Sequence, residues 1–202
     1  MALHKHYCIS SDINVYLWEI TETIEELISL GNLDKDETEV VLGFKSQNRQ
    51  KEWCAVRALL QSVKKGSKIG YNSFGAPYII DEKQFISISH TGKFVAISLS
   101  NKKSTIDIEL KNRNFQKVSH KYVNKEEEVL ISSSEIEPNL ILAIIWSFKE
   151  AVFKYAEHGE IDFKADIQII NFANGRINFL FRKKPSSGVY IIENEYVLTI
   201  TE

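Results

Sequence analysis

The chain has 202 residues, 44% of them hydrophobic and 26% charged, a composition typical of globular proteins that excludes the disordered and collagen-like classes. With 25 Lys and Arg residues against 27 Asp and Glu residues, the chain lacks the basic excess of general nucleic-acid-binding domains. Two cysteines are too few for a disulfide framework. The start of the chain contains no apolar signal segment, and the longest apolar run, residues 140–146, is too short to cross a bilayer. We therefore expect a cytoplasmic protein with reduced thiols that binds neither nucleic acid nor membrane.

In the first half of the chain, alternating apolar residues predict a strand over residues 13–20. A short amphipathic helix is expected over residues 23–30. A long helix is expected over residues 46–65, with Ser46 as its N-cap. Further short strands are expected over residues 78–80, 85–89 and 94–100.

The second half begins with a strand at Thr105. Capping-box spacing predicts a helix over residues 124–131, and the strongest helical pattern in the chain runs from Pro138 to about residue 157. Antiparallel strands are then expected over residues 167–172, 176–181 and 189–200. Because each half combines a long helix with several strands, the sequence predicts an α+β protein with an N-terminal lobe over residues 1–101 and a C-terminal lobe over residues 102–202.

An acidic pair lies on the strand that opens the second half. Side chains alternate along a strand, so Asp107 and Glu109 share one face while Ile106 and Ile108 share the other. Two carboxylates on one face can converge on Mg²⁺, which prefers oxygen ligands. A strand with one core face and one solvated acidic face explains the same pattern.

Two further segments contain candidate catalytic or binding residues. Glu150 and Lys154 lie one helical turn apart, with Trp146 one turn earlier, either as an ordinary surface ion pair or at a cleft. His90 lies beside small hydroxyl residues at a strand end, where it can bind a phosphate or be a structural turn histidine. The dinucleotide fingerprint, the P-loop, the nucleophile elbow and a zinc-ligand set are missing from the sequence.

Taken in order, these motifs resemble the 4′-phosphopantetheinyl transferase superfamily, in particular the two-lobed type that activates peptide and polyketide synthases. The resemblance covers roughly residues 44–160. The motifs that carry it are Phe74-Gly75-Ala76-Pro77-Tyr78, Ile88-Ser89-His90-Thr91, Ile106-Asp107-Ile108-Glu109, and Trp146-Ser147-Phe148-Lys149-Glu150-Ala151 followed by Lys154.

The resemblance implies an enzyme that moves 4′-phosphopantetheine from coenzyme A to a serine of an apo acyl or peptidyl carrier protein. Adenosine 3′,5′-bisphosphate is the product released. The implied fold is two similar α+β lobes with pseudo-twofold symmetry, each an antiparallel sheet packed with a long helix. The active site would lie between the lobes of a monomer.

The resemblance also implies roles for individual residues. Asp107, Glu109 and Glu150 would hold Mg²⁺, and Glu150 would accept the serine proton. Lys154 would contact the pyrophosphate and His90 a phosphate of coenzyme A. The remaining coenzyme A contacts implied by motif position are Arg57, Gly75, Pro77, Ser89, Thr91 and Lys149.

The sequence departs from the family pattern at several places. Thr105 stands where the family often has glycine, and Ala76 stands where it usually has a basic residue that contacts coenzyme A. Residues 156–160 lack the family's second glycine. Two other functions stay open: a metal-dependent phosphodiester hydrolase that uses the same carboxylates, and a non-catalytic module that binds coenzyme A or a carrier protein.

Overall fold

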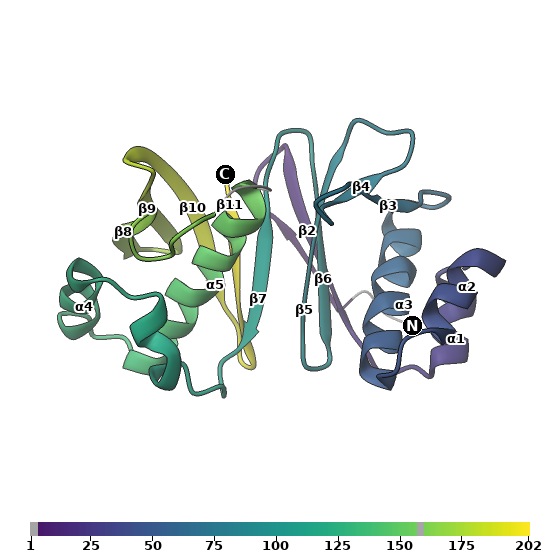
Figure 1. The fold of residues 1–202 in the computed structure, drawn as a ribbon, viewed down its shortest axis with the longest axis horizontal. Helices are drawn as coiled ribbons and strands as arrows, with labels where there is room; N and C mark the ends of the chain where they lie inside the picture. The colour runs from purple at the N-terminus through teal and green to yellow at the C-terminus, as the bar shows by residue number, and fades with distance from the viewer. Residues whose placement is uncertain (1–3, 157–159) are drawn as a thin grey trace. The chain divides into compact units, whose positions relative to one another are not determined.

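The computed structural model describes residues 4–156 and 160–202. The chain divides into two compact units, Met1–Lys102 (the N-terminal unit) and Lys103–Glu202 (the C-terminal unit). Each unit combines an antiparallel sheet with helices (Figure 1), so the α+β fold expected from the sequence is confirmed. The lobe boundary and the pseudo-twofold symmetry stay predictions. Among the helices of the described residues, none is long and apolar enough to cross a membrane.

The N-terminal sheet has the strand order β1-β2-β6-β5, with every neighbouring pair antiparallel. Ile13, Val15 and Leu17 are fully buried on β2, as their alternation predicted. A separate hairpin is formed by β3 and β4. The bounds are β1 Lys5–Cys8, β2 Ile13–Glu19, β3 Ile69–Tyr71, β4 Pro77–Ile79, β5 Phe85–Thr91 and β6 Phe94–Ser100.

The helices of the N-terminal unit are α1 (Ile24–Leu30), α2 (Lys35–Leu42) and α3 (Gln47–Val63). The hydroxyl of Ser46 accepts a hydrogen bond from a backbone N–H in the first turn of α3, as expected for its N-cap. The long helix packs on β2 and β6 and contributes most of its apolar side chains to the core. Sequence reasoning missed α2, although its capping box, formed by Asp34 with a glutamate three residues later, was a usable signal.

The C-terminal sheet has the order β7-β11-β10-β9-β8, again antiparallel throughout. The single strand expected over residues 189–200 is wrong, because the chain turns back within that range. The N–H of Glu193 donates to the carbonyl of Tyr196 (2.9 Å) and closes the hairpin that separates β10 from β11. The bounds are β7 Ile106–Leu110, β8 Ile167–Ala173, β9 Arg176–Phe181, β10 Lys184–Ile192 and β11 Tyr196–Thr201.

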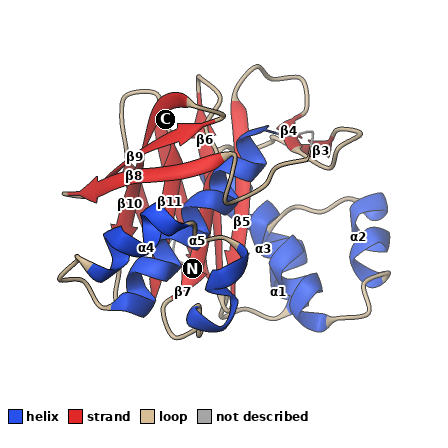
Figure 2. Ribbon diagram, turned by 60° about the vertical axis from the view of Figure 1, so that its left-hand side comes forward, coloured by secondary structure: helices blue, strands red, loops and turns tan. Residues whose placement is uncertain are grey.

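The helices of the C-terminal unit are the 3-10 helix η1 (Gln116–Lys121), α4 (Lys125–Ser132) and α5 (Pro138–Ala156). The end expected for α5 near residue 157 lies outside the described residues. Figure 2 shows α5 lying along the sheet, where it packs on β7 and β11. This approach requires glycine at position 188 of β10, since a Cβ there would collide with the Phe148 ring and the Ile200 carbonyl.

Candidate active site

The acidic strand β7 turns its carboxylates toward α5. Asp107 and Glu109 are only 6% and 7% exposed, so the alternative of a solvated acidic face is wrong. Buried carboxylates need charged or hydrogen-bonding partners, because desolvation of an unpaired charge is costly. The partners described below come from α5 and from the loop after β7.

A row of hydroxyl groups fixes α5 against the sheet. The Thr105 hydroxyl donates to the carbonyl of Ala151 (2.6 Å), and the hydroxyls of Ser147 and Thr199 lie 2.9 Å apart. These bonds join α5 to the start of β7 and to β11. Thr105, the departure from the family's usual glycine, therefore contributes a direct bond between the acidic strand and the helix.

Lys154 and Trp146, two turns apart on α5, meet the acidic pair. The ammonium of Lys154 donates to Asp107 Oδ1 (2.9 Å) and to the Ile106 carbonyl (3.0 Å). The indole Nε1–H of Trp146 donates to Glu109 Oε1 (2.8 Å). Arg113, which sequence reasoning missed, forms an ion pair with the other oxygen of Glu109. Arg113 lies in the loop after β7, where no helical or strand periodicity predicts such a contact.

The three carboxylates of the expected metal site influence one another. Burial raises the pKa of Glu109, and the neighbouring Asp107 raises it further, while Arg113 and the Trp146 indole oppose the change. Burial likewise raises the pKa of Glu150, with Asp107 and Glu109 adding to it and Lys154 opposing. Mutual repulsion of this kind is relieved by a bound cation, and hard oxygen donors suit Mg²⁺.

The donor chemistry therefore fits Mg²⁺. Nevertheless, within residues 4–156 and 160–202 no group of three or more His, Cys, Asp or Glu side chains is already gathered closely enough to hold a metal ion. Asp107 and Glu109 instead have cationic partners, Lys154 and Arg113. A metal would have to compete with these side chains for carboxylate oxygens.

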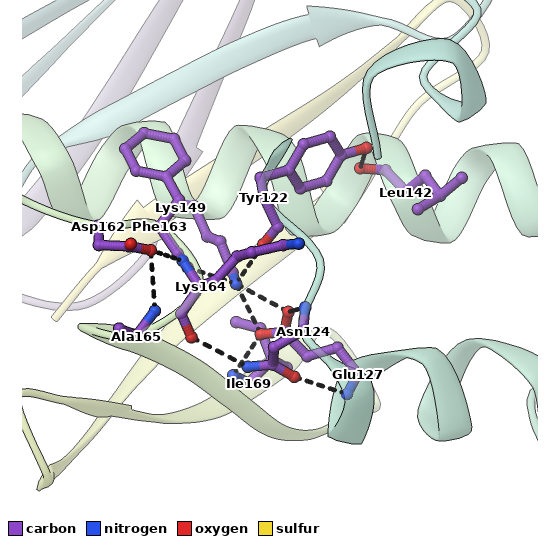
Figure 3. A network of polar contacts seen from close by, with 10 residues as sticks. All are labelled: Tyr122, Asn124, Glu127, Leu142, Lys149, Asp162, Phe163, Lys164, Ala165 and Ile169. Carbon is purple, nitrogen blue, oxygen red and sulfur yellow. Dashed lines mark hydrogen bonds and ion pairs between the residues drawn. The ribbon is translucent and has the colours of Figure 1, made fainter. Parts of the chain in front are cut away.

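Lys149 does not have the role expected for it. Its side chain is completely buried, and its ammonium donates to the Tyr122 carbonyl (2.7 Å), the Phe163 carbonyl (2.7 Å) and the Glu127 carboxylate (2.8 Å), as Figure 3 shows. All three N–H donors thus have oxygen partners inside the protein. The expected contact with coenzyme A is corrected to an internal ion pair with Glu127.

His90 lies in the N-terminal unit, near the end of β5. Its ring nitrogens lie 3.0 Å from Arg49 Nη1 and 3.3 Å from Glu52 Oε2, both on α3. Ser89 and Thr91, its neighbours on β5, are buried. Arg49 is a second missed cation, two helical turns before Arg57.

The other residues expected to contact coenzyme A also lie in the N-terminal unit. Gly75 has a positive φ of 80° in the turn before β4, and Pro77 begins β4. Arg57 is 6% exposed, stacks over Trp53 and pairs with Glu37 (2.9 Å). A phosphate at Arg57 would have to displace this carboxylate, and its contact with coenzyme A stays a prediction.

Comparison with known proteins addresses the unit that contains β7 and α5. Residues 105–201 match the family model described as the 4′-phosphopantetheinyl transferase superfamily, and no curated protein matches the chain. The matched region includes Asp107, Glu109, Trp146, Glu150 and Lys154, which carried the resemblance in this half of the sequence. The resemblance to the 4′-phosphopantetheinyl transferase superfamily is thereby confirmed for residues 105–201, which make up nearly all of the C-terminal unit.

Proposed function

We propose that the protein transfers 4′-phosphopantetheine from coenzyme A to a serine of an apo acyl or peptidyl carrier protein, with Mg²⁺, and releases adenosine 3′,5′-bisphosphate. The observation that carries this proposal is the junction of β7 and α5 in the matched unit. There Asp107 and Glu109 are buried against Lys154 and Trp146. Apolar side chains would fill this junction without the cost of removing charged groups from water. The charged groups there therefore support a functional role.

In the proposed reaction, the carrier serine oxygen forms a bond to the phosphorus attached to the pantetheine group. The bond from that phosphorus to the bisphosphate breaks, and the serine proton passes to Glu150. Without a metal, burial and the neighbouring carboxylates raise the pKa of Glu150; a carboxylate can act as the general base once it lies within hydrogen-bonding reach of the serine hydroxyl, directly or through a water. Lys154 stabilises the negative charge that develops on the leaving group.

Asp107, Glu109 and Glu150 are the residues that would hold Mg²⁺. The ion would neutralise phosphate charge and fix the diphosphate in place. We assign coenzyme A contacts to Arg57, Gly75, Pro77, Ser89, His90 and Thr91 by motif position. Both cysteines are free thiols, which supports a reducing, cytoplasmic setting, and we propose that the protein acts as a monomer.

The test is to incubate the protein with coenzyme A, Mg²⁺ and a panel of apo carrier proteins, and then to weigh the carriers. Transfer adds about 340 Da to the modified serine, the mass of the covalently attached group. Release of free phosphopantetheine without a carrier would favour the hydrolase instead. Binding of coenzyme A with every carrier unmodified would favour the non-catalytic module.

A further inference from the structure

The ion pair of Lys149 and Glu127 has no direct role in the proposed reaction. Both side chains are 0% exposed. The Glu127 carboxylate also accepts hydrogen bonds from the backbone N–H groups of Asn124 (3.0 Å) and Ile169 (2.8 Å), as Figure 3 shows. The pair therefore joins α5 to the start of α4 and to β8. Replacing a buried ion pair by apolar residues is often neutral for stability, so the presence of the pair is weak evidence for a stabilising role.

The two carbonyl partners of Lys149 belong to aromatic residues. The rings of these residues, Tyr122 and Phe163, both contact the indole of Trp146, with ring centroids 5.0 Å and 5.8 Å apart. The ammonium thus holds the backbone of both residues that flank Trp146. Because aromatic contacts depend on geometry, holding these two backbones restricts where the indole can lie.

The indole in turn orients a carboxylate of the proposed site. Trp146 Nε1–H donates to Glu109 Oε1 (2.8 Å). A continuous set of contacts therefore runs from the ammonium of Lys149, through Tyr122 and Phe163, to Trp146 and Glu109. Partners that orient ligating carboxylates typically change affinity or activity 10- to 100-fold when they are removed.

We propose that the Glu127–Lys149 pair is a positioning device that holds Trp146, and through it the carboxylate of Glu109. Lys149 and Glu127 are positioning residues, since both are buried and neither touches the proposed substrates. The effect on transfer rests on the proposed function. The effect on the indole of Trp146 does not.

The first measurement uses ¹⁵N-labelled protein without added metal or coenzyme A. The indole N–H resonance of Trp146 is assigned by its loss in Trp146→Phe. In the pair replacement Glu127→Gln with Lys149→Met, this resonance should move or broaden, because the indole no longer has one fixed hydrogen bond to Glu109. The control is Phe179→Leu, which weakens the same core where Phe179 packs on Phe148 and should leave the resonance in place.

The second measurement is transfer to a carrier at saturating coenzyme A. The pair replacement and Trp146→Phe should each lose roughly 10- to 100-fold. Because the pair acts through Trp146, combining all three substitutions should cost no more than Trp146→Phe alone. Phe179→Leu should retain transfer at temperatures where it is folded.

An unmoved indole resonance would overturn the proposal, and so would additive losses in the combined variant. If the pair replacement does not fold, Glu127→Leu with Lys149→Met is a second, fully apolar version. Failure of both to fold would also overturn the proposal, because the pair would then be required for stability itself. If the wild-type protein modifies no carrier, the proposed function fails, while the resonance still decides whether the pair positions Trp146.

Discussion

Replacing Lys154 by alanine separates a catalytic ammonium from an ordinary ion pair. In the structure its ammonium donates to Asp107 Oδ1 and to the Ile106 carbonyl. A hydrogen bond to a charged group contributes roughly 1.5–3 kcal/mol. Because the Lys154 side chain is 29% exposed, we expect the lower part of that range, about 1.5–2 kcal/mol of lost unfolding free energy.

Loss of transfer should exceed what this destabilisation explains. Removal of one electrostatic stabiliser of a transition state typically costs about 100-fold in rate, equivalent to about 2.7 kcal/mol. Stability is measured by urea unfolding followed by circular dichroism, and transfer by the mass of the carrier at early times. Lys154→Arg is the matched control, since it keeps the charge beside Asp107. An alanine variant with a near-native transfer rate would refute the catalytic role, whatever its stability.

Glu150→Gln should keep the fold and lose at least about 100-fold in the rate of transfer, because the amide cannot accept the serine proton. A variant with near-native activity would show that Glu150 is not the general base. Gly188→Ala should lower unfolding free energy by about 1–3 kcal/mol, since its Cβ collides with Phe148, and an unchanged melting temperature would contradict this. Burial raises the pKa of Cys54 to about 11, so at pH 8 it holds little reactive thiolate. Ellman's reagent should label exposed Cys8 in the native protein and Cys54 only after unfolding; rapid labelling of both would show that Cys54 is accessible.

Local sequence patterns were sufficient to predict the two α-helices of the C-terminal unit, α4 and α5, but not the 3-10 helix η1. The capping box of Asn124 and Glu127 fixed the start of α4, as its spacing predicted. Apolar periodicity predicted α5 from Pro138, and alternation predicted that Asp107 and Glu109 share a face of β7. These features are encoded within a few residues of one another, because helical turns, caps and strand alternation are local properties.

The partners of the charged side chains were decided by the tertiary structure. Lys149 and Glu150 are neighbours in sequence, but a helix rotates by about 100° per residue, so they point in different directions. That Lys149 is the one that meets Glu127 depends on what packs against each side of α5. The ammonium of Lys154 likewise donates to Asp107, 47 residues away, a contact that the helical spacing of Lys154 and Glu150 did not predict.

The sequence by itself therefore determined the fold class and the long helices, and it proposed a set of residues for a transferase site. The tertiary structure decided that Trp146 orients Glu109, that Arg113 pairs with it, and that Lys149 is internal. The physical reason is sequence separation. The contacts Trp146–Glu109 and Lys149–Glu127 join residues 37 and 22 positions apart, and no local pattern specifies a partner at that distance. Burial then makes those pairings necessary, because a charged side chain that is removed from water without a partner costs several kcal/mol.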